Sequence, residues 1–331
     1  SNFISLTQSG SDALEVAMHL LKLKKTDEVI IPSYTFSATA NSVVLANGKP
    51  VFADIREKDL CLDLDKVEKL INKNTKAICL VHYGGNSCDL DKALMLKKKY
   101  KIKIIEDAAH ALFSKYKDKF CGTIGDIGIY SFHDTKNFTS AQGGAISINN
   151  LNLIKRGSNI LNKGNSKKLT KKNYYFWVDK GSEYEMSGFS AALLSNQILQ
   201  SHKYQNKRSI IFKRYQKELS NNKYSNILRV ISENEYSQHS YHLFAVILKN
   251  NIYKKNFVEF MLKNKIQVMG HYFPLHLSPM GQKYRKFSCK MTENLYDRLV
   301  RLPIYPSLSK QDINKILKVT NKFLKKFDEN K

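Results

Sequence analysis

The chain has 331 residues, with 54 Lys and Arg against 29 Asp and Glu, which gives a net charge of +25. This length is enough for one large core or two lobes. Hydrophobic residues make up 42% of the chain, and no apolar run reaches the roughly 18 residues of a membrane span. The lysine excess could indicate nucleic-acid binding, but the lysines are spread out, without a zinc finger, an RNA-recognition signature or a basic arm. We therefore expect a mostly solvated basic surface, which is also compatible with an anionic small substrate.

The cysteines indicate the redox environment of the protein, and the first residues indicate how the sequence begins. Five cysteines are widely spaced without a Cys-x-x-Cys pair, so neither a metal site nor a disulfide framework is predicted. A reduced, cytoplasmic setting fits this pattern, and no secretory signal opens the chain. Because the sequence begins at Ser1 in an apparent strand, without a methionine, we expect a preceding segment that adds substrate and subunit contacts.

The first two hundred residues alternate short apolar runs with helical patterns. Several runs are rich in Val and Ile at successive positions, as is typical of strands buried on both faces. This alternation predicts an α/β fold, a mixed, mostly parallel sheet flanked by helices. The expected strands cover 3–7, 28–33, 50–55, 76–83, 101–107, 127–133 and 144–149, and the expected helices cover 11–23, 35–47, 64–73 and 89–100.

Residues 163–185 interrupt the alternation with a polar, basic and then aromatic stretch that contains Trp177, the only tryptophan. So long an irregular loop in a compact domain is either mobile or functional. A helical stretch follows from about residue 189.

A second region completes the chain. It holds expected strands at 240–248 and 266–273 and a closing helix from about 309. We therefore expect a large domain over 1–205 and a smaller α+β domain over 206–331.

Residues 8–21 combine a strand end, a tight turn at Gly10 and an amphipathic helix with Ser11 at the N-cap position. Free N–H groups and the helix dipole make such a start favourable for a phosphate. An ordinary capped helix has the same pattern.

Polar side chains follow several of the expected strands. Asp107 ends an almost wholly apolar strand, where a carboxylate is costly unless it meets a partner. It could face a buried cation, such as a protonated ring nitrogen, or cap the next helix. His110 follows three residues later. In parallel sheets, ligands bind beyond the carboxyl ends of the strands, which is where these residues lie.

Ser131, His133 and Lys136 follow the apolar run 127–132. A lysine at a strand end with desolvating neighbours can lose its proton and act as a nucleophile, although most lysines are solvated. Phe36 also follows a strand, and it could pack in the core or against a bound ring.

The order and spacing of these stretches are more specific than any one of them. Over nearly its whole length the chain resembles the DegT/DnrJ/EryC1/StrS family of nucleotide-sugar aminotransferases, which are fold-type I pyridoxal-phosphate (PLP) enzymes. The matching stretches are SGSDAL at 9–14, PSYTFSATAN at 32–41, VHYGG at 81–85, EDAAH at 106–110, GTIGDIGIYSFHDTKNFTSAQGGA at 122–145, HYFPLH at 271–276 and RLVRLPIYPSLS at 298–309.

The resemblance implies a role for each matching residue. Lys136 would hold PLP covalently and later move a proton between carbons, and Asp107 would keep the pyridine nitrogen protonated. Phe36 would stack on the ring, with His110 against it or near its phenolic oxygen. The phosphate would be held by Gly10, Ser11, the backbone of Asp12, and Ser131.

The resemblance also implies the reaction and its partners. The amino group of L-glutamate would pass, through pyridoxamine phosphate, to a nucleotide-linked keto sugar in a homodimer with shared active sites. The sequence FHxTKN at 132–137 is similar to that of family members that aminate C4 of the sugar. Members that aminate C3 more often have Tyr in place of His133. The expected substrate is dTDP-4-keto-6-deoxy-D-glucose, for surface polysaccharide. The candidate substrate contacts are His133, Glu185 and His271.

The chain departs from the family pattern at 184–192, where YEMSGFSAA replaces YxMSDxQAA. Gly188 replaces the usual Asp and Ser190 replaces the usual Gln. Glu185 places a negative charge where Arg, Leu or Asn is usual. In the family this stretch commonly reaches the partner subunit's active site.

Three alternatives stay open. One is a C3 aminotransferase, and a second is a sugar dehydratase, which in this fold has His in place of the lysine, so that Lys136 disfavours it. The third is a basic nucleic-acid-binding protein without catalysis, which would bind with a steep dependence on salt.

Overall fold

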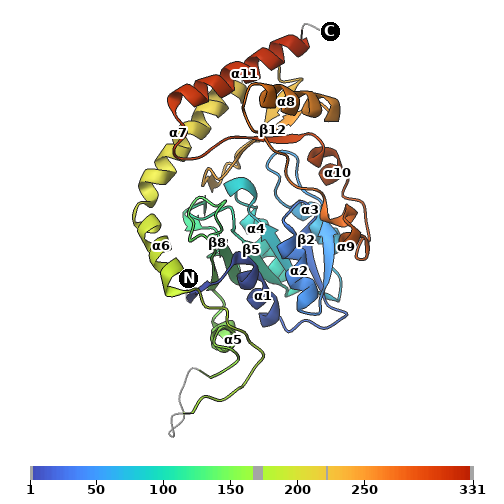
Figure 1. Ribbon diagram of the computed structural model, residues 1–331. Coiled ribbons are helices and arrows are strands. Elements are labelled where there is room, and N and C mark those ends of the chain that lie inside the picture. Colours follow the sequence, from blue (N-terminus) through green and yellow to red (C-terminus); the bar gives the residue numbers. More distant parts are fainter. Residues whose placement is uncertain (1–2, 167–173, 221–222, 329–331) are drawn as a thin grey trace.

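A seven-stranded sheet forms the centre of the computed structural model, which describes residues 3–166, 174–220 and 223–328 (Figure 1). The strand order is β1-β9-β8-β5-β4-β2-β3. β9 is antiparallel to both of its neighbours, and the other pairs are parallel. The predicted mixed, mostly parallel sheet is confirmed. The strands are β1 (Ile4–Thr7), β2 (Glu28–Pro32), β3 (Lys49–Ala53), β4 (Thr75–Val81), β5 (Lys103–Asp107), β8 (Ile127–Ser131) and β9 (Gly144–Ile148).

Helices cover both faces of this sheet. In β2, Val29 and Ile31 belong to a core with α1, α2 and α5, whereas Ile30 belongs to a second core with α3 and α4. Successive side chains of a strand point to opposite faces, so burial on both faces explains the Val and Ile at successive positions. The helices are α1 (Gly10–Leu20), α2 (Ser37–Leu45), α3 (Leu64–Leu70), α4 (Leu90–Tyr100) and α5 (Leu151–Leu161).

A second, antiparallel sheet of order β10-β12-β13 has its own core with α7, α8 and α11. Figure 1 places these elements at the end of the molecule opposite α5. The predicted boundary between 205 and 206 falls within α7, so a continuous helix joins the two regions, and the domain division stays a prediction. The elements are β10 (Leu228–Val230), β12 (Phe244–Leu248), β13 (Leu299–Leu302), α6 (Gly188–Leu199), α7 (Ser201–Ser220), α8 (Asn251–Lys263) and α11 (Lys310–Asp328).

Short elements connect the two regions. In a three-stranded ribbon, β6 pairs with β7, both of them between β5 and β8, and with β11, which precedes β12. These elements are β6 (Lys115–Tyr116), β7 (Lys119–Phe120), β11 (Ser237–Gln238), the 3-10 helices η1 (Tyr83–Gly85) and η2 (Leu275–Leu277), α9 (Pro279–Gln282) and α10 (Lys290–Tyr296).

The strand expected at 266–273 is wrong. Only Met269 forms a bridge, to Arg301. The rings of His271 and Tyr272 stack with centroids 3.7 Å apart, so these neighbours lie on one side of the chain. A strand would point them to opposite faces.

Of the stretch 163–185, which we expected to be irregular, the structure describes all but residues 167–173. Isolated bridges join Asn165 to Trp177 and Asn162 to Glu183. Figure 1 shows the stretch leaving the body of the molecule beyond α5. Trp177 is 81% exposed.

No helix within the described ranges is long and apolar enough to cross a membrane. The five cysteines are all buried and unpaired. The same ranges contain no group of three or more His, Cys, Asp or Glu side chains that could hold a metal ion.

Glu106, in β5, fixes the segment that leads into β8. Its buried carboxylate accepts hydrogen bonds from the N–H groups of Gly122, Ile124 and Gly125 and from Nε2 of His82. We expect Glu106→Ala to lower the free energy of unfolding by about 3–5 kcal/mol, because it leaves buried donors without an acceptor. Urea unfolding followed by circular dichroism measures the change.

The matched control is Glu218→Ala, which breaks only an exposed ion pair with Arg214 on α7. Its expected cost is below about 1 kcal/mol. Equal losses in the two variants would contradict this role of Glu106.

Candidate active site

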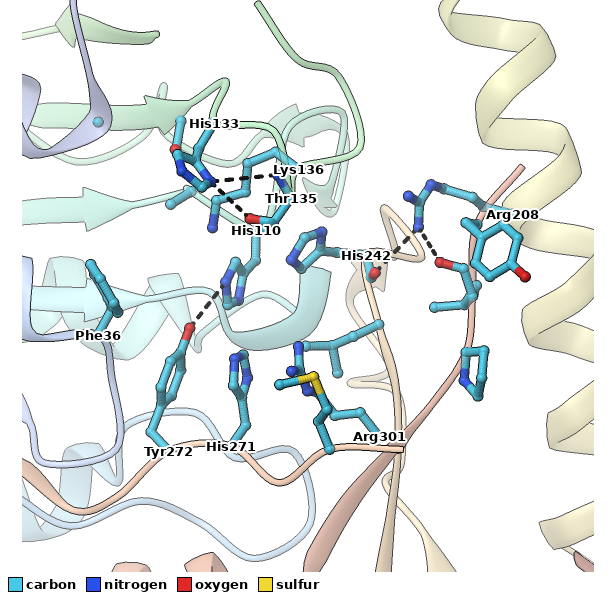
Figure 2. Close-up of a pocket in the computed structure, with 18 of the residues that line it drawn as sticks. Phe36, His110, His133, Thr135, Lys136, Arg208, His242, His271, Tyr272 and Arg301 are labelled. Atoms are coloured by element: carbon cyan, nitrogen blue, oxygen red, sulfur yellow. Dashed lines mark hydrogen bonds between the residues drawn. The ribbon is translucent and has the colours of Figure 1, made fainter. Parts of the chain in front are cut away.

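A cavity of about 1080 Å³ lies between the carboxyl ends of the parallel strands and the second sheet. Figure 2 shows how side chains from both regions converge on it. The predicted site residues that line it are Gly10, Ser11, Phe36, Asp107, His110, Ser131, His133, Lys136 and His271.

Adjacent strand ends bring the two predicted catalytic residues together. Asp107 is the last residue of β5 and Ser131 is the last residue of β8, and these parallel strands are neighbours. The loop that carries Lys136 is anchored at both ends, because the N–H of Phe132 donates to the carbonyl of Gly143 and the side-chain amide of Asn137 donates to the carbonyl of Ser240. The sheet therefore determines where the lysine lies.

Asp107 is buried and held on both carboxylate oxygens. It accepts hydrogen bonds of 3.1 Å from Thr39 Oγ1 and from the N–H of Ala109. Burial raises the pKa of Asp107, while the Ala109 N–H, Lys136 and Thr39 oppose the rise. No helix directly follows β5, so Asp107 does not cap one: it accepts from the Ala109 N–H in a turn and lines the cavity. That it faces a cationic ring nitrogen stays a prediction.

The solvated alternative for Lys136 is wrong, because the side chain is half-buried in the cavity. The pKa of Lys136 is lowered to about 8: burial lowers it, Asp107 opposes the change, and Arg301 adds to it. An ordinary lysine has a pKa near 10.4. At pH 7 roughly one-tenth of this amine is therefore unprotonated, against well under one-hundredth for an ordinary lysine.

The lowered pKa makes the reactivity of Lys136 depend on pH. Only the neutral amine attacks a carbonyl, so we expect the apoprotein to react with pyridoxal phosphate faster as the pH rises from 6.5, with a plateau above the pKa of about 8. Stopped-flow absorbance measures this rate. A rate that keeps rising tenfold per pH unit beyond 9 would indicate an ordinary lysine.

The predicted N-cap is wrong by two residues. α1 begins at Gly10, and Ser9 is the cap, with its Oγ accepting from the N–H of Asp12 at 3.0 Å. The Asp12 amide is thus already engaged, and Asp12 does not line the cavity. The N–H groups of Gly10 and Ser11 have no acceptor within the helix.

Gly10 lets the first turn of α1 approach the end of β8. A Cβ at Gly10 would lie 2.9 Å from Cβ of Ser131. Two free N–H groups, the start of the helix dipole and a serine hydroxyl thus meet at one end of the cavity, which is a suitable arrangement for a phosphate.

Three histidines in the cavity are held neutral. His110 stacks on His242 with ring centroids 4.3 Å apart, and burial, followed by the charge of Lys136, places the pKa of both well below the usual range. Burial, then Arg301 and Lys136, lower the pKa of His271 to about 3. The N–H of Gly84 donates to Nδ1 of His110, so the proton of this ring is on Nε2, 3.4 Å from the Tyr272 hydroxyl (Figure 2).

The other candidates occupy different environments. Phe36 is 61% exposed, so the core-packing alternative is wrong. His133 is exposed and lies beside Thr135 and Asp134. Glu185 is exposed and does not line the cavity, and its backbone bridges to Thr7.

Sequence reasoning missed four residues that the fold adds. Thr39 and Tyr272 lie within recognised stretches, but nothing in their local pattern assigns a contact to Asp107 or His110. His242 and Arg301 come from the second region; Arg301 also lies in a recognised stretch, 298–309, but in a chain with 54 Lys and Arg an arginine carries no signal of its own. These residues are recognisable only from their three-dimensional positions.

This sheet order, with a lysine and an aspartate at neighbouring strand ends, is that of the fold-type I PLP-dependent aminotransferases. A Helicobacter pylori structure described as PseC, an aminotransferase involved in the biosynthesis of pseudoaminic acid, superposes with a TM-score of 0.90 at 26% identity, over 98% of this chain and 87% of that one. The predicted fold class is confirmed.

The chain belongs to the DegT/DnrJ/EryC1/StrS aminotransferase family, whose profile matches residues 2–320. It is 32% identical to the UDP-4-amino-4,6-dideoxy-N-acetyl-beta-L-altrosamine transaminase of Campylobacter jejuni, over 92% of this chain and 81% of the relative. It is 28% identical to the dTDP-3-amino-3,6-dideoxy-alpha-D-galactopyranose transaminase of Aneurinibacillus thermoaerophilus, over 95% and 84%. The predicted enzyme class, an aminotransferase, is confirmed.

Proposed function

We propose that the protein is a PLP-dependent aminotransferase that moves the amino group of L-glutamate to C4 of dTDP-4-keto-6-deoxy-D-glucose, giving dTDP-4-amino-4,6-dideoxygalactose for surface polysaccharide. The observation that carries the proposal is the amine of Lys136, whose pKa is lowered to about 8, in one cavity with the buried Asp107. The names of the relatives support a nucleotide-linked sugar as substrate.

The residues of the cavity fit PLP. Among the residues that the structure describes, only Thr39 and Ala109 donate hydrogen bonds to the buried carboxylate of Asp107, and a protonated ring nitrogen would compensate its charge. The phosphate would lie between the start of α1 and Ser131, and the exposed ring of Phe36 would cover the pyridine ring. When bound, the cofactor supplies an electron sink for the reacting carbon.

The protein side chains supply the proton transfers. Nζ of Lys136 accepts a proton from one carbon and returns it to the other, which requires a pKa near the working pH. Asp107 stays ionised beside the ring nitrogen and keeps that nitrogen protonated. The neutral rings of His110 and His271 add no positive charge that would oppose this ion pair.

The choice of C4 rests on His133. The two relatives differ in the carbon that their names assign, 4-amino in one and 3-amino in the other, so C3 amination is the second candidate. The imidazole of His133 lines the cavity from the loop that carries Lys136, which suits a contact with the sugar or its diphosphate.

The proposal includes a homodimer in which 184–192 reaches the partner's site. Phe189, at the start of α6, is 85% exposed, and Glu185, four residues earlier in the chain, is also exposed. Burial of such apolar surface favours association. Sedimentation equilibrium that gives a monomer at micromolar concentration would contradict it.

One experiment tests the reaction. The protein is incubated with PLP, L-glutamate and a panel of nucleotide-linked 4-keto and 3-keto sugars, and products are identified by mass spectrometry and NMR. We expect amination at C4 of the dTDP-linked 4-keto-6-deoxy sugar. Amination at C3, or loss of water without nitrogen transfer, would contradict the proposal, and salt-sensitive RNA or DNA binding without turnover would favour the nucleic-acid alternative.

A further inference from the structure

His276, in η2, belongs to a chain of hydrogen bonds that lies beside the cavity but does not line it. Its side chain is fully buried, and its Nδ1 lies 2.5 Å from Oγ of Ser33, the residue after β2. Its Nε2 lies 2.8 Å from Oε1 of Glu293, in α10. Ser33 is also fully buried, whereas the side chain of Glu293 is 31% exposed. The chain of hydrogen bonds thus connects the protein surface with the end of a buried strand.

These hydrogen bonds determine which nitrogen of His276 carries the proton. Among the described residues, Oγ of Ser33 has two partners, the Nδ1 and the backbone N–H of His276. The N–H can only donate, so the Ser33 hydroxyl donates its hydrogen to Nδ1. The ring proton is therefore on Nε2, which donates it to the carboxylate of Glu293. Because both ring nitrogens are engaged, the ring is held in one orientation.

The order serine, histidine, glutamate is also that of a hydrolytic triad. A nucleophilic serine must be within reach of a substrate carbonyl, but Ser33 is fully buried and does not line the cavity. Its oxygen also accepts a hydrogen bond of 3.3 Å from the N–H of His276. The arrangement therefore orients a backbone segment and does not activate a nucleophile.

The oriented segment is the loop 271–276. Near its end, the N–H of Leu275 donates to the carbonyl of Ser33 at 2.9 Å, so that three hydrogen bonds join the loop to the end of β2. At its start, Tyr272 lines the cavity, with its hydroxyl 3.4 Å from Nε2 of His110. The contacts at one end of the loop thus determine where its other end lies in the cavity.

Glu293 is itself held in place by the large sheet. Asp54, which follows β3, accepts hydrogen bonds of 2.8 to 3.0 Å from the N–H groups of Met291 and Thr292 and from Oγ1 of Thr292. These contacts fix the start of α10 at the end of β3, the parallel neighbour of β2. The loop 271–276 is therefore placed relative to the ends of two strands.

We propose that His276 is a positioning residue, which keeps the loop 271–276 in the place that the aminotransferase reaction requires. This inference rests on the proposed function. The ring centroid of Tyr272 lies 5.8 Å from that of Tyr34 and 6.4 Å from that of Phe36, both in the segment after β2. A shift of the loop against β2 would therefore move one wall of the cavity past the other. A displacement of about 1 Å in a site can lower a rate by roughly 10²-fold.

The test compares Glu293→Leu with Glu293→Gln. Leucine has a similar size but no acceptor, whereas glutamine keeps an acceptor oxygen for Nε2 of His276. Conversion of bound PLP to pyridoxamine phosphate by L-glutamate is followed by absorbance. We expect its rate to fall roughly 5- to 50-fold in Glu293→Leu and less than about threefold in Glu293→Gln. The matched control is Ser288→Ala, which removes another hydrogen bond to the same carboxylate oxygen and should retain the native rate.

Visible circular dichroism of bound PLP separates positioning from a loss of stability. The band depends on how the protein holds the cofactor, and it is measured without turnover at a temperature where every variant is folded. It should weaken in Glu293→Leu and in Ser33→Ala, and remain native in Glu293→Gln and Ser288→Ala. In the apoprotein, the effects of Ser33→Ala and Glu293→Leu on urea unfolding should be non-additive, because both residues act through one imidazole.

A native rate and a native dichroism band in a folded Glu293→Leu protein would overturn the inference. Equal losses in Glu293→Leu and Ser288→Ala would also overturn it, because they would assign the effect to α10 and not to the histidine. If L-glutamate does not convert bound PLP in the unmodified protein, the proposed function is wrong. The dichroism band and the unfolding measurements still test the position of the loop in that case.

Discussion

Replacement of Lys136 by alanine is expected to reduce turnover by at least about 10³-fold, because the same amine binds the cofactor and moves the proton. The residue is half-buried in the cavity with a pKa lowered to about 8, so no other group supplies a neutral amine at that position. The decrease should appear both in the absorbance change on addition of L-glutamate and in the steady-state rate with the keto sugar.

Lys203→Ala is the matched control, since Lys203 is an exposed lysine of α7. It should retain full activity. Borohydride reduction of the holoenzyme followed by peptide mass analysis should label Lys136 in the unmodified protein and in the control. Labelling at another lysine, or an active Lys136→Ala protein, would contradict the assignment of the catalytic residue.

Asp107→Asn is expected to lower the rate of the glutamate half-reaction by roughly 10²- to 10³-fold, as for loss of a preorganised charge interaction. Asparagine has nearly the same shape, so the fold is retained, but it does not carry the charge that keeps the ring nitrogen protonated. It also presents an N–H₂ group to Thr39 or to the Ala109 N–H, both of which donate to the native carboxylate. Weaker binding of the cofactor should accompany the slower reaction.

Thr39→Val provides a graded comparison for this result. It removes one hydrogen bond of 3.1 Å to Asp107 but leaves the charge, so we expect a decrease of less than about tenfold. Single-turnover absorbance measurements at saturating cofactor separate the rate from cofactor affinity. If Asp107→Asn reacts as fast as the native protein, the ring nitrogen does not depend on this carboxylate.

The placement of Lys136 and Asp107 in one cavity could be predicted because it depends on strand ends. Two buried, parallel strands that end in polar residues place these residues at one edge of a sheet, and the apolar runs marked both ends. The wrong assignments have local causes. Ser9 and Ser11 are both good N-caps, and only the backbone of Ser9, extended before the helix, distinguishes them. The run 266–273 has strand-like composition, but the stacked rings of His271 and Tyr272 are incompatible with a strand.

The sequence by itself determined the α/β layer, because periodicity and strand ends are local properties. The order and spacing of its motifs, through their resemblance to the family, indicated the amine and carboxylate that line the cavity. Only the tertiary structure decided the electrostatic state of the site. The lowered pKa of Lys136, the neutral histidines and the unpaired Arg301 arise where the second sheet closes over the first. Residues 107, 136, 242, 271 and 301 line one cavity there, and their desolvation depends on packing between segments far apart in the chain.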